Sequence, residues 1–167
     1  RIVELQLSLP AILIALVLVA ILGQGTDKII IALVAVQWAY YARTIRAQAI
    51  IEKTREYIEA ARMLRYSTSR IVLRHLLPNC LPPLIVLVTM QVAAAIALEA
   101  TLSFLGIGLP LTEPSLGLLI SNGYADMLSG RYWLSFYPGL ALLFTIVSIN
   151  LVGDQLRDVL NPKARQQ

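Results

Sequence analysis

Charged residues, cysteine and histidine are all scarce in this sequence. Asp, Glu, Lys and Arg make up 14% of its 167 residues, against about 25% in soluble domains. A single cysteine excludes a disulfide scaffold, and an apolar content of 57% excludes a disordered chain. Together with a mean hydropathy of +0.71, the low charge argues against a typical soluble enzyme and indicates a membrane protein.

Motifs for catalysis, metal binding and nucleotide binding are missing as well. The only histidine, His75, and the only cysteine, Cys80, have no further ligand or base near them in sequence. We interpret Cys80 as a small apolar packing residue. No stretch matches the glycine-rich loop with Lys-Ser/Thr that holds ATP phosphates. We therefore expect no enzyme activity and no cofactor on this chain.

Four apolar runs are present, at about residues 5–22, 29–45, 81–105 and 132–152. A helix needs about 20 apolar residues to cross a bilayer, and the alternation of barrel strands is absent. A buried helix of a soluble protein would explain the short second run alone but not the last two. The sequence predicts an all-α polytopic membrane protein with four transmembrane helices.

The basic residues are distributed unevenly around these runs. Twelve of the 14 lie at the two chain ends or between residues 43 and 80, and the exceptions are Lys28 and Arg131. Four crossings put both ends and the 46–80 connection on one side of the bilayer. The positive-inside rule assigns that side to the cytoplasm, and it explains the basic charge without nucleic acid.

The 46–80 connection has apolar residues at near-helical spacing over 50–64. A turn is expected near residues 64–68, where Ser67 or Ser69 would cap a second short helix. Two interpretations of the residues remain open at this point: a linker held by anionic lipid, or a docking surface for a partner. On the opposite side, residues 116–127 predict another short helix.

One pair of motifs in this connection resembles a known signature. Glu59-Ala60-Ala61 is followed at a fixed distance by His75-Leu76-Leu77-Pro78, similar to the EAA signature of bacterial ABC importer permeases. The similarity is greatest to the dipeptide/oligopeptide/nickel class. It extends over about residues 1–162, through EYIEAARML, RHLLPN, PPLIV, EATLSFLGIG, PGLALLF and NLVGDQLRD in the expected order.

This resemblance implies a type I ABC importer permease fold over residues 1–167. Such permeases usually have six spans, and these four resemble the last four, so we expect the carboxyl-terminal portion of the domain. It implies half of a translocation pathway for di- or oligopeptides in the bacterial inner membrane, with nickel, glutathione and opines as other possible cargoes. The implied partners are ATP-binding cassette ATPase subunits, a second homologous permease, an extracytoplasmic substrate-binding protein and the lipid bilayer.

The resemblance also assigns an ATPase-coupling role to residues in the 46–80 connection. These are Glu59, Ala60, Ala61, Arg65, Leu77 and Pro78. Arg65 stands where the family pattern has glycine, which suggests a strained turn with positive φ or a salt bridge to the ATPase. A secondary transporter or channel, with 46–80 as a lipid-bound linker, is the alternative function.

Gln91 and Glu99 are the polar residues of interest inside a predicted span. A charged carboxylate at mid-bilayer costs about 2.5–3.5 kcal/mol on insertion scales, so Glu99 needs a partner group or a wet cavity. We expect a packing role for Glu99, while a polar face from Gln91 to Glu99 that lines the pathway is the alternative.

Overall fold

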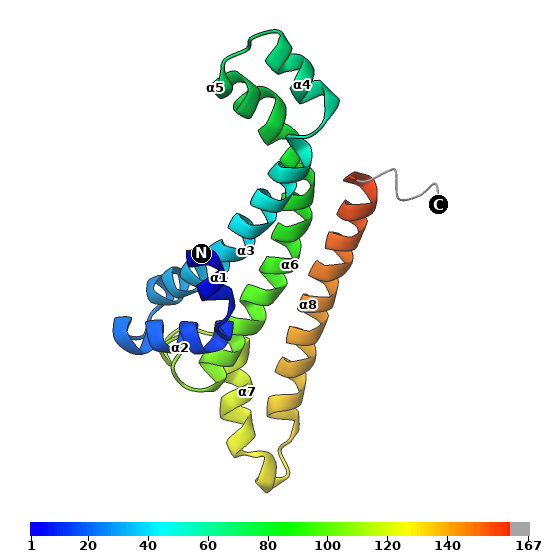
Figure 1. Ribbon diagram of the computed structural model, residues 1–167. Coiled ribbons are helices and arrows are strands. Elements are labelled where there is room, and N and C mark those ends of the chain that lie inside the picture. The colour runs from blue at the N-terminus through cyan, green and yellow to red at the C-terminus, as the bar shows by residue number, and fades with distance from the viewer. Residues whose placement is uncertain (161–167) are drawn as a thin grey trace.

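The computed structural model describes residues 1–160, and all regular structure in this range is helical (Figure 1). The prediction of an all-α chain is confirmed there, while the predicted basic carboxyl end, Lys163 and Arg165, lies outside the described residues. The elements are α1 Ile2–Leu7, α2 Ala11–Leu22, α3 Thr26–Glu52, α4 Glu56–Met63, α5 Thr68–Ile71, the π-helix η1 Val72–Leu76, α6 Leu77–Phe104, α7 Leu116–Ala125, the 3-10 helix η2 Met127–Ser129 and α8 Trp133–Leu160.

Two helical stretches are long and apolar enough to cross a membrane. Thr68–Phe104, which includes α6, and Trp133–Leu160, which is α8, have mean hydropathies of 2.1 and 1.7 in their most apolar windows. Only 6% of each window is buried within the chain, whereas the core helix of a soluble protein is mostly buried. Except for Leu105 and Tyr132, these helices contain the predicted runs 81–105 and 132–152. Their exposed apolar faces suit lipid or other membrane helices.

The predicted helix over 5–22 is wrong as a continuous element. The chain breaks at Ser8–Pro10, between α1 and α2, because Pro10 lacks an N–H donor and disfavours a helical conformation at Leu9. The 12 residues of α2 measure about 18 Å, less than the hydrocarbon thickness of about 30 Å. In Figure 1, α2 runs across the direction of α6.

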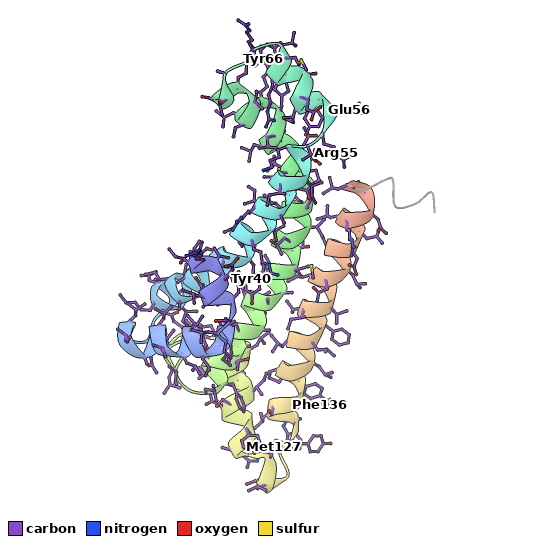
Figure 2. All side chains as sticks on the ribbon, viewed as in Figure 1. Tyr40, Arg55, Glu56, Tyr66, Met127 and Phe136 are labelled. Carbon is purple, nitrogen blue, oxygen red and sulfur yellow. The ribbon has the colours of Figure 1, made fainter. Side chains whose placement is uncertain are left out.

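The second predicted run is longer than expected. Helix α3 continues through 46–52, which were assigned to the connection, because Ala47, Gln48 and Ala49 are good helix formers and no breaker occurs before Lys53. The α4–α5 hairpin, residues 56–71, therefore begins later than predicted. It lies at one end of the long helices, with α7 at the other (Figures 1 and 2).

Helices α6, α7 and α8 pack closely through glycine. A Cβ atom placed on Gly117 of α7 would overlap the backbone of Ala100 in α6, and one on Gly123 would overlap the backbone of Leu134 and Ser135 at the start of α8. These glycines let helix backbones approach where a side chain would keep them apart. A separate core joins α2 and α3 to the end of α6, through Ala15, Val19, Ile29, Ala32, Val36 and Leu102.

We expect Gly117→Ala to destabilise the protein, because its methyl group must displace the α6 backbone. Overpacking of this kind costs about 1–3 kcal/mol. Gly139→Ala in α8 is the matched control, since nothing lies within 4 Å of a Cβ there and alanine favours the helix. Thermal unfolding of the protein in detergent measures the stability of both variants. Equal melting temperatures for the two variants would contradict the close α6–α7 contact.

Candidate functional site

The turn between α4 and α5 has a defined backbone geometry. Arg65 N–H donates to the carbonyl of Arg62 at 2.9 Å, and Tyr66 N–H donates to the carbonyl of Ala61 at 3.2 Å. This pair of bonds is a Schellman motif, in which the residue after the helix cap takes a left-handed conformation and is usually glycine. Arg65 has φ +53°, the only positive φ of a non-glycine residue within 1–160. The positive φ suggested for this turn is present at Arg65, whereas the strain that it would cause stays a prediction.

The EAA residues do not share one surface. Glu59 and Ala60 are exposed, whereas Ala61 is buried together with Ile58 inside the hairpin. The small side chain of Ala61 packs within the hairpin, and its ATPase-coupling role stays a prediction. The exposed tip surface of the hairpin consists of Glu59, Ala60, Met63, Leu64 and Arg65, and Met63 is 86% exposed.

The second half of the hairpin joins the turn directly to α6. Ser67, the first of the two predicted caps, accepts the Arg70 N–H at 3.4 Å. The Tyr66 ring stacks on His75 with centroids 6.0 Å apart, and the Arg70 guanidinium carbon lies 4.2 Å above the same Tyr66 ring. These contacts link the turn to η1, immediately before the membrane helix.

Leu77 and Pro78 are exposed but lie away from the tip. The four-residue α5 and the five-residue η1 separate them from the turn at Arg65. Pro78 lacks the N–H that would bond back to Arg74, which favours the wider π-turn at this point. The structure therefore divides the predicted coupling residues between the tip of the hairpin and its base.

A hydrogen bond at the base of the hairpin fixes α4 to the end of α3. Tyr57 donates its hydroxyl proton to Glu52 Oε2 at 2.7 Å, and Arg55 Nε lies 3.9 Å from Glu52 Oε1. Burial, followed by the hydrogen bond and the charge of Glu52, raises the pKa of Tyr57 to about 12. Tyr57 thus remains a protonated donor at physiological pH.

Glu99 organises the other end of α6. Its Oε1 accepts hydrogen bonds from Ser103 Oγ at 2.7 Å and from Ser115 Oγ at 2.9 Å. Ser115 in turn accepts the N–H groups of Gly117 and Leu118 and so caps α7. The network supports the packing interpretation of Glu99. Sequence reasoning missed both serines, although Ser115 before Leu116 has the pattern of a helix cap.

Gln91 does not take part in the Glu99 network. It lies midway along α6, is 9% exposed, and lines a cleft of about 540 Å³ among α2, α3 and α6 that does not include Glu99. The predicted polar face from Gln91 to Glu99 is therefore not one surface. Glu99 bonds to serines of α6 and of the segment before α7, whereas Gln91 opens onto the cleft.

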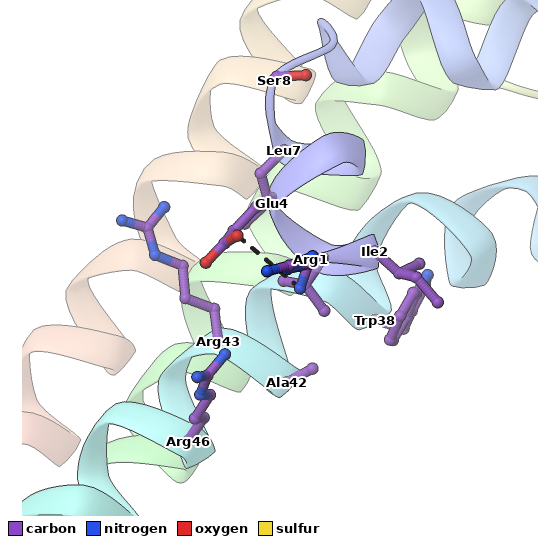
Figure 3. A pocket seen from close by; sticks show the side chains of 10 residues that line it. Arg1, Ile2, Glu4, Leu7, Ser8, Trp38, Ala42, Arg43 and Arg46 are labelled. Atoms are coloured by element: carbon purple, nitrogen blue, oxygen red, sulfur yellow. Dashed lines mark ion pairs between the residues drawn. The ribbon is translucent and has the colours of Figure 1, made fainter.

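A second cavity, of about 710 Å³, lies between α1 and α3 (Figure 3). Arg1, Arg43 and Arg46 line this cavity. The start of the chain therefore lies beside residues 43–46 of α3, and the basic residues of both segments are on the same side. Gln6 Nε2 anchors α1 there by donating to the carbonyl of Ala35 at 2.6 Å. The ion pair between the Arg1 amino group and Glu4 is solvent-exposed and contributes little.

The chain combines apolar membrane helices, a protruding polar hairpin with the EAA residues, and closely packed small residues. These features define its class as a membrane permease component. The chain belongs to the family of binding-protein-dependent transport system inner membrane components, and the sequence model of this family matches residues 1–166. The resemblance noted in the sequence is confirmed. This is a family of transport proteins rather than enzymes.

Curated relatives agree along the whole chain. A Brucella abortus protein, provisionally named a peptide transport system permease protein, is 41% identical over 167 residues, which are 100% of this chain and 56% of the relative. The dipeptide transport system permease proteins DppC of Escherichia coli K12 and Bacillus subtilis are 39% and 37% identical over 99% of this chain, and 55% and 52% of their own lengths. The chain thus spans about half the length of these relatives.

Replacing Arg65 tests the turn geometry. Arg65→Gly should relieve a left-handed strain of about 1 kcal/mol, whereas Arg65→Ala retains a Cβ atom and the strain. Amide exchange at Tyr66, whose N–H bonds to Ala61, should slow about fivefold in the glycine variant. The strain account fails if glycine protects this amide no better than alanine does.

Proposed function

We propose that this chain is part of a permease subunit of an ATP-driven importer for di- or oligopeptides. The family description supports a binding-protein-dependent transport role, and the names of the relatives support peptides as cargo. The observation that carries the proposal is the α4–α5 hairpin, which extends beyond the long apolar helices with a closed, hydrogen-bonded tip (Figure 1).

The tip surface is the part of the hairpin that docks on an ATPase subunit. Met63 and Leu64 are 86% and 65% exposed next to Glu59 and Arg65, outside the apolar part of the chain. Exposed apolar side chains rimmed by charges are typical of a protein contact. Methionine also adapts its shape to a partner surface.

The hairpin is built to transmit movement rather than absorb it. Tyr57–Glu52 attaches its first helix to α3, and Tyr66–His75 attaches its turn to η1. From Thr68 onward the helical backbone continues through α6. Displacement of the tip by an ATPase would therefore reach the membrane helices, since packed elements move as rigid bodies.

The alternative, a secondary transporter or channel with a lipid-bound linker, is less compatible with this geometry. A helix lying on a bilayer directs its apolar face to the lipid. In α4 that face, Ile58 and Ala61, is buried inside the hairpin instead. What remains exposed is the compact tip surface, which suits a protein partner better than an extended lipid contact.

The cytoplasmic assignment of the hairpin is tested by cysteine labelling of the complete importer in a Cys80-free background. Because the basic residues favour the cytoplasm for the hairpin side, a membrane-impermeant reagent added outside should modify a cysteine at Asp126 and not one at Lys53. Modification at Lys53 from outside would reverse the orientation and remove the docking argument.

Met63→Gln tests docking at the tip. The change keeps side-chain length and helix propensity while removing an apolar contact, so ATPase retention during purification should weaken about tenfold. Met127→Gln, an exposed methionine at the opposite end of the bundle (Figure 2), should retain ATPase normally. Unchanged retention in Met63→Gln would overturn docking at the tip. If no ATPase copurifies with the unsubstituted importer, the proposed function itself fails.

A further inference from the structure

The cleft among α2, α3 and α6 has an unusual lining for the middle of a membrane protein. Four uncharged polar side chains from two helices line it, and two alanines of α6 leave space in it. We call it the amide cleft, with Gln37 and Tyr40 on α3, and Gln91, Ala94, Ala97 and Thr101 on α6. No Asp, Glu, Lys or Arg lines it.

Helical geometry explains how these residues converge. Gln37 and Tyr40 are three residues apart on α3, and Gln91, Ala94 and Thr101 recur on one face of α6. Both glutamines lie near the midpoints of their helices. The cleft of about 540 Å³ is within the size range of small-molecule sites, which are mostly apolar with a few placed polar groups.

Gln91 has an unused hydrogen-bonding group. Its side chain is largely buried at 9% exposure, yet its amide forms no hydrogen bond to residues 1–160. Gln37 Nε2 donates, at 3.3 Å, to the backbone carbonyl of Gln91 and not to its side chain. Within residues 1–160, His75 Nε2 is the only fully enclosed side-chain nitrogen or oxygen without a hydrogen-bond partner, so the unpaired Gln91 amide is not fully enclosed. A polar group in a largely buried side chain is costly to leave unpaired, so the Gln91 amide needs a ligand or water in the cleft to bond to it.

The chemistry of the cleft matches a peptide backbone. A primary amide has both a donor and an acceptor, as does each peptide group, so the two can pair through complementary hydrogen bonds. Such pairing is independent of the peptide's side chains. The absence of charge avoids selecting or trapping acidic or basic peptides, and the alanines leave space for side chains of different size.

We propose that the amide cleft is a binding position for the backbone of a peptide in transit, and that Gln91 forms the hydrogen bonds that hold it there. This inference rests on the proposed function, and it adds the location and the chemistry of recognition. Gln37 and Tyr40 complete the site from α3. The site is selective for peptide groups and tolerant of peptide sequence.

The test introduces a charge without changing shape. In the complete importer at pH 8, Gln91→Glu should raise uptake of Ala-Lys-Ala relative to Ala-Glu-Ala about tenfold over the ratio of the unsubstituted importer, since a carboxylate attracts one peptide and repels the other. The substrate-binding protein is the same in both measurements, so its own preference cancels. Gln155→Glu, an exposed change on α8 away from the cleft, is the matched control and should leave the ratio unaltered.

A second variant tests the space in the cleft. Ala94→Leu should reduce uptake of a phenylalanine-containing tripeptide at least about fivefold more than uptake of triglycine, because the added side chain fills room that a large residue needs. Uniform loss across peptides in both Gln91→Glu and Ala94→Leu would overturn the inference and indicate a protein contact at the cleft. An unsubstituted importer without ATP-dependent peptide uptake would instead refute the proposed function.

Discussion

The continuous helical backbone from Thr68 to Phe104 is the constraint on which the other features depend. A lipid environment requires each backbone donor and acceptor to be paired within the chain, so a stretch of this length must remain helical even where the sequence opposes it. Pro78, Pro82 and Pro83 remove three donors near its start, and the backbone adjusts through the π-turn at η1 instead of breaking. As a result, one helix carries the hairpin at one end, Gln91 at its midpoint and Glu99 near the other end.

Polar groups along this helix are handled in two different ways. Glu99, the residue most expensive to place in a membrane, accepts hydrogen bonds from Ser103 and Ser115. Ser115 also caps the start of α7 by accepting the Gly117 N–H. Gln91 is neutral and lacks such partners within the described chain, facing a cleft instead. A charge so thoroughly hydrogen-bonded serves packing, whereas an unpaired amide beside a cleft is available to a ligand.

The fold class, two long apolar helices and the position of the hairpin turn could be predicted from local patterns in the sequence. The broken helix over 5–22 could not be predicted from apolar composition alone, although Pro10 was its local signal. Burial of Ala61 follows from its spacing with Ile58, because residues three apart lie on one face of α4. The EAA motif directed attention to a coupling role for Ala61 instead of to this spacing. The Glu99–Ser115 bond joins residues 16 apart across a loop, and no periodicity encodes such a pairing. Local periodicity thus predicts helices, while long-range polar partners depend on the three-dimensional packing.

Both attachments of the hairpin lead to one contact in the bundle, the seam between α3 and α6. Gly117 brings α7 against the α6 backbone, and a methyl group on Gly153 of α8 would overlap the Thr89 side chain of α6. Helices α6, α7 and α8 therefore form a block with little freedom to slide. Helices α3 and α6 also pack against each other, in the core that includes Val36 and Leu102, but the amide cleft opens along this seam and Gln37 bonds across it at 3.3 Å. Because the hairpin is attached to α3 through Glu52 and to α6 through η1, its displacement acts on both sides of this seam. Gln91 faces the amide cleft along this seam, so displacement of the hairpin and binding of a peptide are both proposed to act on the same contact between helices.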